Sequence, residues 1–255
     1  MNATLRIALH VLLTASVIVP SLSAQVTDTL PCTLDGFYVE QSLDSAIKDL
    51  RSVNSALSVF MERTDGEQPC MFIVSCVATI SDERIMLVWG MVDGVPWVID
   101  TVVQTDGDVR LASAEGDWLQ FLSDGQMIAQ RKARRTGRRY VRVARDLEQM
   151  NQYVRSLTLA GTYKRDGGSS CTFTSDGRFL VDGDTLLYRV RYEANDGKYD
   201  VLEVTHRFNQ HEPVLYEIKR HGAEVILQPV VRDEESYEHD STRRRIRLLP
   251  ATGKR

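Results

Sequence analysis

The sequence predicts a mainly β fold built of antiparallel meanders, with a helix packed on a sheet near the N-terminus. Nine of the 16 glycines directly follow an aspartate, and such pairs between apolar runs are typical of type I′ hairpin turns. From Gly94 to Gly197 these pairs recur at the spacing of strands. Between Leu43 and Phe60, large apolar residues instead recur every three or four positions, which predicts one amphipathic helix with Ser42 as its N-cap.

The first 24 residues have the pattern of a secretory signal peptide. Arg6 precedes the apolar stretch Ile7–Val19, Pro20 ends it, and small residues follow up to Ser23 and Ala24. A membrane-spanning helix would need about 20 apolar residues, and this stretch is shorter. We therefore expect cleavage after Ser23 or Ala24, a secreted or periplasmic protein, and no transmembrane segment after cleavage.

Four cysteines in an exported chain predict disulfides. Cys70 and Cys76 flank one β-like run and would lie about 20 Å apart on a single strand, which is too far for a bond. We expect Cys32 to pair with Cys70 or Cys76. The remaining one of these two either reaches Cys171 or stays a buried thiol.

The chain divides into two predicted units after the signal peptide. Residues 25–145 form a helix plus an antiparallel β unit, residues 146–158 a connecting helix, and residues 159–255 a second β unit. The strands expected in the first unit are approximately Cys70–Ile80, Arg84–Val92, Trp97–Val103, Val109–Ser113, Trp118–Leu122, Gln126–Lys132 and Arg138–Ala144.

The second unit begins at Gly161-Thr162-Tyr163, and strand-like runs follow it to the end of the chain. In one of them, large apolar residues occupy every second position, so one face of that strand is expected to be buried. These residues are Leu186, Tyr188, Val190 and Tyr192, and they alternate with Leu187, Arg189, Arg191 and Glu193. The runs are approximately Cys171–Thr174, Phe179–Val181, Thr185–Tyr192, Tyr199–Thr205, Val214–Arg220, Glu224–Val230 and Arg244–Leu249.

A short internal echo links the two units. Phe121-Leu122-Ser123-Asp124-Gly125 resembles Phe173-Thr174-Ser175-Asp176-Gly177. Either a shared hairpin turn or a duplication explains it.

The opening Gly161-x-Tyr163, the hairpin Phe173-x-x-Asp176-Gly177 and the basic last strand Arg243–Arg247 also carry a family resemblance. With these residues, the region from about Leu159 to Leu249 resembles a small lipocalin-like β-barrel domain of exported, Bacteroidota-type bacterial proteins of unknown function. Tyr163 stands where classical lipocalins have tryptophan. In the first unit, Trp89-Gly90, Asp93-Gly94 and Pro96-Trp97 resemble segments common in exported proteins of the same phylum.

Such a barrel holds one small ligand or fills its interior with side chains. Large residues expected to point inward favour a filled or narrow interior: Phe179, Tyr188, Tyr192 and Tyr216.

The sequence contains none of the common catalytic, phosphate-binding or dinucleotide-binding motifs, and we assign no catalytic residue. His206, His211 and Glu212 near one turn are the best metal-ligand candidates. The acidic loop from Asp233 to Asp240 matches no calcium-loop pattern. We interpret both as solvated turns, and expect no metal and no cofactor.

The most distinctive charge feature is an arginine-rich hairpin between residues 131 and 145. Arg134, Arg135, Arg138 and Arg139 are the candidate ligand-binding residues, because guanidinium groups that converge can bind phosphate or sulfate. The alternative is a solvated hairpin balanced by acidic neighbours. Nucleic acid is not an expected partner, given export and a net charge of −4.

We therefore expect an exported, non-enzymatic β-rich protein that binds a small apolar ligand or an envelope polyanion. Its partners would be an envelope glycan, lipid or protein. Two alternatives stay open: an exported hydrolase with a dispersed active site, and a structural or assembly protein of the cell envelope.

Overall fold

The computed structural model divides into two compact units. Unit 1 contains the chain up to residue 45 and residues 60–150, and unit 2 contains residues 46–59 and 151–255. The predicted mainly β, antiparallel class is confirmed. The described residues are 34–64, 71–75, 87–90, 101–105, 108–113, 115–130, 132, 137–191, 200–205, 212–232 and 237–251.

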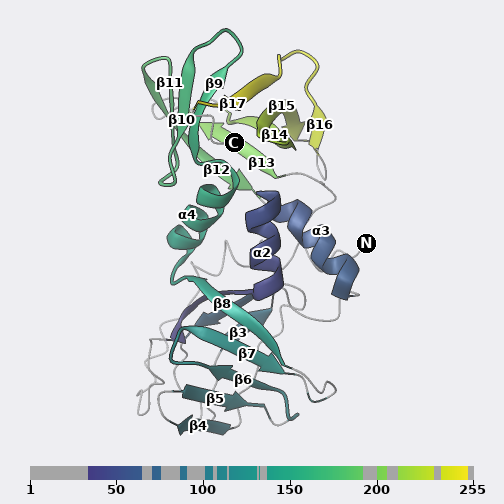
Figure 1. The fold of residues 1–255 in the computed structure, drawn as a ribbon, viewed down its shortest axis with the longest axis vertical. Coiled ribbons are helices and arrows are strands. Elements are labelled where there is room, and N and C mark those ends of the chain that lie inside the picture. Colours follow the sequence, from purple (N-terminus) through teal and green to yellow (C-terminus); the bar gives the residue numbers. More distant parts are fainter. Residues whose placement is uncertain are drawn as a thin grey trace. The chain divides into compact units, whose positions relative to one another are not determined.

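The sheet of unit 1 is an antiparallel meander that returns to its first strand. Its order is β3-β2-β1-β8-β7-β6-β5-β4, so β8 pairs with β1, and Figure 1 shows β8 to β4 following one another. The strands are β1 (Gly36–Glu40), β2 (Met71–Ser75), β3 (Leu87–Gly90), β4 (Thr101–Thr105), β5 (Asp108–Ala112), β6 (Trp118–Phe121), β7 (Gln126–Gln130) and β8 (Arg138–Ala144).

One face of this sheet forms the hydrophobic core of unit 1. Tyr38 and Phe121 belong to this core, with ring centroids 5.6 Å apart and an edge-to-face angle of 75°. The other buried members are Leu34, Val74, Val109, Leu111, Leu119, Met127 and Tyr140. Alternate residues of β5 to β8 supply this core, so the residues between them lie on the opposite face.

Unit 2 contains a closed eight-stranded antiparallel barrel, as the resemblance implies. Each strand pairs with the next from β9 to β15, and β17 joins β15 to β9; β16 adds to the edge of β15. The strands are β9 (Gly161–Arg165), β10 (Ser170–Phe173), β11 (Arg178–Val181), β12 (Asp184–Arg191), β13 (Val201–Thr205), β14 (Val214–His221), β15 (Glu224–Arg232), β16 (Tyr237–His239) and β17 (Ile246–Pro250).

Strand β1 was not predicted, because every strand expected from the sequence lies after the predicted helix 43–60, whereas β1 precedes it. It opens with Leu34-x-Gly36-x-Tyr38, and the barrel of unit 2 opens with the same pattern, Leu159-x-Gly161-x-Tyr163. In each unit the tyrosine hydroxyl donates a hydrogen bond to the leucine carbonyl, at 2.8 and 2.9 Å. The two units therefore begin their meanders with the same local structure.

The echo between the FLSDG and FTSDG segments reflects turn chemistry. The first turn joins β6 to β7, late in its meander, while the second joins β10 to β11, directly after the opening strand. In both, the glycine N–H donates to the carbonyl three residues earlier, at 3.0 Å in Gly125 and 3.1 Å in Gly177. Because the two hairpins occupy different places, they do not mark equivalent positions of a duplication.

The turn type predicted for the aspartate-glycine pairs is correct at only some of them. Asp182 and Gly183 have φ of +51° and +89°, as a type I′ turn requires. At Gly125 and Gly177 the glycine has positive φ, but among the described residues other than glycine only Arg51 and Asp182 do. Those hairpins are three-residue turns in which glycine alone takes the left-handed conformation.

The predicted helix over residues 43–60 is two helices, α2 (Gln41–Leu50) and α3 (Val53–Thr64). Arg51 breaks them with a φ of +52°. The side chain of Glu40, rather than Ser42, caps the start of α2, since its Oε2 accepts the N–H groups of Ser42 and Leu43. A third helix, α4 (Leu147–Thr158), precedes the barrel. None of the described helices is long and apolar enough to cross a membrane.

We expect Gly36→Ala to destabilise unit 1 more than Gly161→Ala destabilises unit 2. Both glycines have nearly the same φ, +151° and +150°, but a Cβ at Gly36 would lie 2.5 Å from the Ala144 carbonyl oxygen. At Gly161 the nearest atoms belong to the Tyr163 ring, at 3.5 Å. Backbone strain alone costs about 1–3 kcal/mol, and Gly36→Ala adds a backbone clash. Urea unfolding of both variants measures the difference; equal losses would contradict it.

Candidate functional site

The exposed side of β5 to β8 in unit 1 is the candidate binding surface, and we refer to it as the outer face. It carries the residues that alternate with the buried core positions of these strands. It includes Asp108, Arg110, Trp118, Gln120, Ile128 and Arg139.

A row of four paired residues crosses the outer face. Arg110 pairs with Gln120, Gln120 with Ile128, and Ile128 with Arg139. Residues directly opposite each other in an antiparallel ladder share a face. Three steps of about 4.8 Å place the two arginines about 14 Å apart along the sheet. Both arginines are exposed, so the row ends in a cation on each side of an uncharged centre.

Trp118 holds one of these cations in place. The guanidinium carbon of Arg110 lies 4.4 Å from the centroid of the Trp118 ring, within the range of a cation–π contact. Trp118 itself is half-buried on β6, two residues before Gln120. Because the indole restrains the guanidinium, Arg110 loses less conformational entropy when its donors bind an anion.

Asp108 supplies an acceptor beside the row. Its Oδ2 accepts a hydrogen bond from Gln120 Nε2 at 3.1 Å, and its Oδ1 accepts the Ser123 N–H at 3.0 Å. These contacts fix Gln120 next to Arg110. The outer face therefore combines forked cationic donors with neutral and anionic acceptors.

The structure does not gather the four arginines predicted from the sequence. Arg134 and Arg135 lie outside the described residues. Arg138 and Arg139 are neighbours on β8, so their side chains point to opposite faces. The Arg138 guanidinium lies 5.7 Å from the Phe60 ring, whereas Arg139 belongs to the outer face. Sequence analysis missed Arg110, since it stands alone in its own strand.

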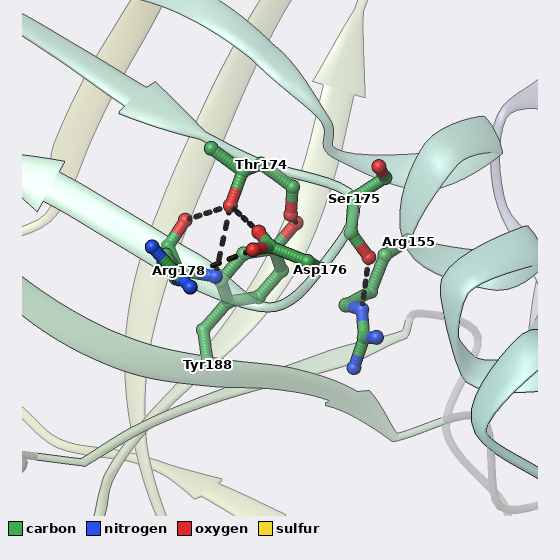
Figure 2. Close-up of polar contacts among 6 residues, drawn as sticks. All are labelled: Arg155, Thr174, Ser175, Asp176, Arg178 and Tyr188. Atoms are coloured by element: carbon green, nitrogen blue, oxygen red, sulfur yellow. Dashed lines mark hydrogen bonds and ion pairs between the residues drawn. The ribbon is translucent and has the colours of Figure 1, made fainter.

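A polar cluster surrounds the FTSDG turn of the unit 2 barrel. Figure 2 shows Arg155 reaching from α4 to this turn, where its Nε donates to the Ser175 carbonyl at 2.7 Å. The Tyr188 hydroxyl donates to the Thr174 carbonyl at 2.7 Å. Asp176 accepts from the Thr174 hydroxyl and pairs with Arg178 at 3.1 Å.

The ionisation of this cluster suits a structural role. Burial raises the pKa of the Tyr188 hydroxyl, which keeps it a neutral donor. The hydrogen bond from Thr174 lowers the pKa of Asp176, with Arg178 adding to the effect, so that carboxylate stays ionised. Because donors and acceptors satisfy one another within the cluster, we interpret it as a structural link between α4 and the turn.

Aromatic rings pack together in the interior of the barrel. Phe173 stacks on Phe179 with centroids 4.1 Å apart, and Tyr188 and Tyr163 meet Phe173 edge-on at 5.2 and 6.0 Å. Among the residues expected to fill the interior, Phe179 and Tyr188 are buried there. Tyr216 is half-buried, and Tyr192 lies outside the described residues.

Cys171 is a free, buried thiol, so the alternative in which the remaining one of Cys70 and Cys76 bonds to it is wrong. Burial raises its pKa to about 11, so it is protonated near neutral pH and unreactive as a nucleophile. The predicted bond between Cys32 and Cys70 or Cys76 lies outside the described residues.

Only some of the metal-ligand candidates lie within the described residues. His206, His211 and residues 233–236 lie outside the described residues, and Glu212 is exposed. Asp240 accepts hydrogen bonds from Thr242. In the part of the chain that the structure describes, no three histidine, cysteine, aspartate or glutamate side chains come together as metal ligands.

A cluster of three ionisable residues joins β14 to β16. Glu217 Oε2 lies 3.1 Å from both Lys219 Nζ and His239 Nε2. Histidine and carboxylate are the partners that a hydrolase would use, but the third member is an ammonium group rather than a hydroxyl or thiol nucleophile. The contacts therefore favour an ion-pair network that attaches β16 to the barrel.

Comparison with family models, with curated proteins and with solved structures finds no match to this chain.

Proposed function

We propose that this protein is an exported, non-enzymatic polyanion-binding protein of the cell envelope, secreted or periplasmic, with a lipocalin-like barrel of the Bacteroidota type as its second unit. The observation that carries the binding function is the row from Arg110 to Arg139. It presents two exposed guanidinium groups on one sheet face, and one of them is restrained by Trp118. Guanidinium groups bind sulfate, phosphate and carboxylate through paired donors.

The aromatic packing of unit 2 supports a polyanion over an apolar ligand. Phe173, Phe179 and Tyr188 are buried and pack on one another inside the barrel. A polyanion on the outer face of unit 1 needs no interior cavity. The net negative charge of the chain does not prevent a polyanion from binding here, because salt screens charges more than about 10 Å away and the two arginines contact the ligand directly.

We expect Arg110→Gln and Arg139→Gln each to weaken binding of dextran sulfate about fivefold, since an exposed ion pair contributes up to about 1 kcal/mol. Glutamine keeps the length and polarity of the side chain while removing its charge. Isothermal titration calorimetry at low and high salt measures the affinity and its salt dependence, which each substitution should reduce.

Lys164→Gln is the matched control, because it removes one exposed positive charge from unit 2. It should leave the affinity unchanged. No binding by the wild-type chain, or equal losses from all three substitutions, would refute the outer face as the site.

A further inference from the structure

The outer face carries acceptors between its cationic ends. The Asp108 carboxylate stands two residues before Arg110 on the same face of β5, and carboxylate oxygens accept hydrogen bonds without donating them. Gln120 uses its amide nitrogen on Asp108, so its carbonyl oxygen is the group that can accept a hydrogen bond from a ligand. A ligand matching this face must therefore supply donors as well as negative charge.

This requirement separates two kinds of polyanion. Polyphosphate carries acceptor oxygens along its whole length and few donors near neutral pH, so it would place negative charge against Asp108 without a hydrogen bond in return. An acidic polysaccharide carries hydroxyl groups between its anionic groups, and each hydroxyl both donates and accepts. Its anionic groups can meet the arginines while its hydroxyls meet Gln120 and Asp108.

The centre of the face also offers apolar surface. Trp118 and Ile128 are half-buried on neighbouring strands and flank Gln120, which pairs directly with Ile128. An indole ring combines an apolar body with a polar N–H, and so suits a ligand whose rings have both C–H faces and hydroxyl edges. Sugar rings have both, whereas a phosphate chain has neither.

Building on the proposed function, we infer that the outer face of unit 1 binds an acidic polysaccharide, with Arg110 and Arg139 on its anionic groups and Trp118, Gln120 and Asp108 on the sugar between them. The contact of Arg110 with Trp118 brings the charge-binding and sugar-binding parts of the surface together.

The test compares two polyanions of matched charge on the full chain by isothermal titration calorimetry. The probes are linear polyphosphate and a dextran sulfate of low degree of sulfation, which keeps free hydroxyl groups on its sugar rings. We expect the wild-type protein to bind dextran sulfate about tenfold more tightly. Gln120→Ala should weaken dextran sulfate binding severalfold and leave polyphosphate binding almost unchanged. Trp118→Ala also releases the Arg110 guanidinium, so it should weaken the binding of both polyanions, but dextran sulfate more than polyphosphate. The preference for dextran sulfate should therefore fall with either substitution.

The outcomes separate the two proposals. If polyphosphate binds as tightly as dextran sulfate, or if Trp118→Ala and Gln120→Ala weaken both equally, the polysaccharide inference is wrong while polyanion binding stands. If neither polyanion binds, both fail. Gln120→Ala leaves the Arg110–Trp118 contact in place and guards against a folding defect in Trp118→Ala, and far-UV circular dichroism checks the fold of each variant.

Discussion

Phe173→Ala should lower the free energy of unfolding of unit 2 by about 3–5 kcal/mol, the usual loss when a buried phenylalanine is truncated. Phe173 is 1% exposed and contacts three other aromatic rings. Its truncation removes apolar burial and leaves a cavity between rings that are held from other strands. The surrounding barrel is closed, so its strands have little freedom to collapse into the space.

The distribution of tryptophan makes this prediction specific to one unit. Trp89, Trp97 and Trp118 all belong to unit 1, and residues 151–255 contain no tryptophan. Urea unfolding followed by far-UV circular dichroism reports both units, while tryptophan fluorescence reports unit 1. Phe173→Ala should shift the circular dichroism transition of unit 2 and leave the fluorescence transition in place.

Leu180→Ala provides the matched control for Phe173→Ala. Leu180 is 40% exposed on β11, so its truncation removes little buried area and should change stability by under about 1 kcal/mol. A similar loss from both substitutions would contradict the importance of the aromatic cluster. A shift of the tryptophan transition by Phe173→Ala would show that the two units unfold together.

The meanders could be predicted because their signals are local. Asp182-Gly183 lies between alternating runs, and a strand that is buried on one face shows that alternation in its own residues. Strand β1 lacks such support: its partners β2 and β8 lie far along the chain, and it runs directly into a helix. The repeated Leu-x-Gly-x-Tyr pattern was the available signal for it.

The candidate site could be predicted only in part, since strand register decides which side chains share a face. The dense run of arginines from Arg134 to Arg139 predicts a cationic site, yet the side chains of neighbouring residues on a strand point to opposite faces of the sheet. Arg110 joins Arg139 through Gln120 and Ile128 on two intervening strands. No spacing rule within one segment reveals a row that crosses four strands.

The break between α2 and α3 could not be predicted either, because a residue distant in sequence stabilises it. The Asp200 carboxylate accepts the N–H groups of Val53 and Asn54, at 3.0 and 2.9 Å, through separate oxygens. It caps the start of α3 from 147 and 146 residues away. A continuous helix would use those N–H groups internally, so the contact favours two helices.

Asp200→Ala should therefore destabilise unit 2 by about 2–6 kcal/mol. The substitution leaves two buried backbone donors without their acceptor, and each unsatisfied buried donor costs about 1–3 kcal/mol. Asp200 is 1% exposed, so water does not readily replace the carboxylate. Asp200→Asn should lose less, because one oxygen remains, while its amide nitrogen faces the other N–H.

The dependence of the free energy of unfolding on pH distinguishes an electrostatic role of Asp200 from simple packing. Burial raises its pKa above the usual value of 3.8, although the N–H groups of Asn54 and Val53 oppose the shift. The native state therefore binds this proton more tightly than the unfolded chain does. The resulting stabilisation is complete below pH 3.8 and is lost as pH rises through the native pKa.

Asp200→Asn removes this titration while keeping the side-chain shape. The stability difference between wild type and Asp200→Asn should therefore be larger near pH 4 than near pH 7. Urea unfolding of both proteins at several pH values, followed by circular dichroism, measures it. Asp176 and Asp240 have lowered pKa values and so stabilise the fold at higher pH, which is opposite to the effect of Asp200. Subtracting the free energy of unfolding of Asp200→Asn from that of wild type at each pH cancels their contribution. A difference that is independent of pH would show that Asp200 titrates alike in the native and unfolded chains, and that its burial has no electrostatic consequence.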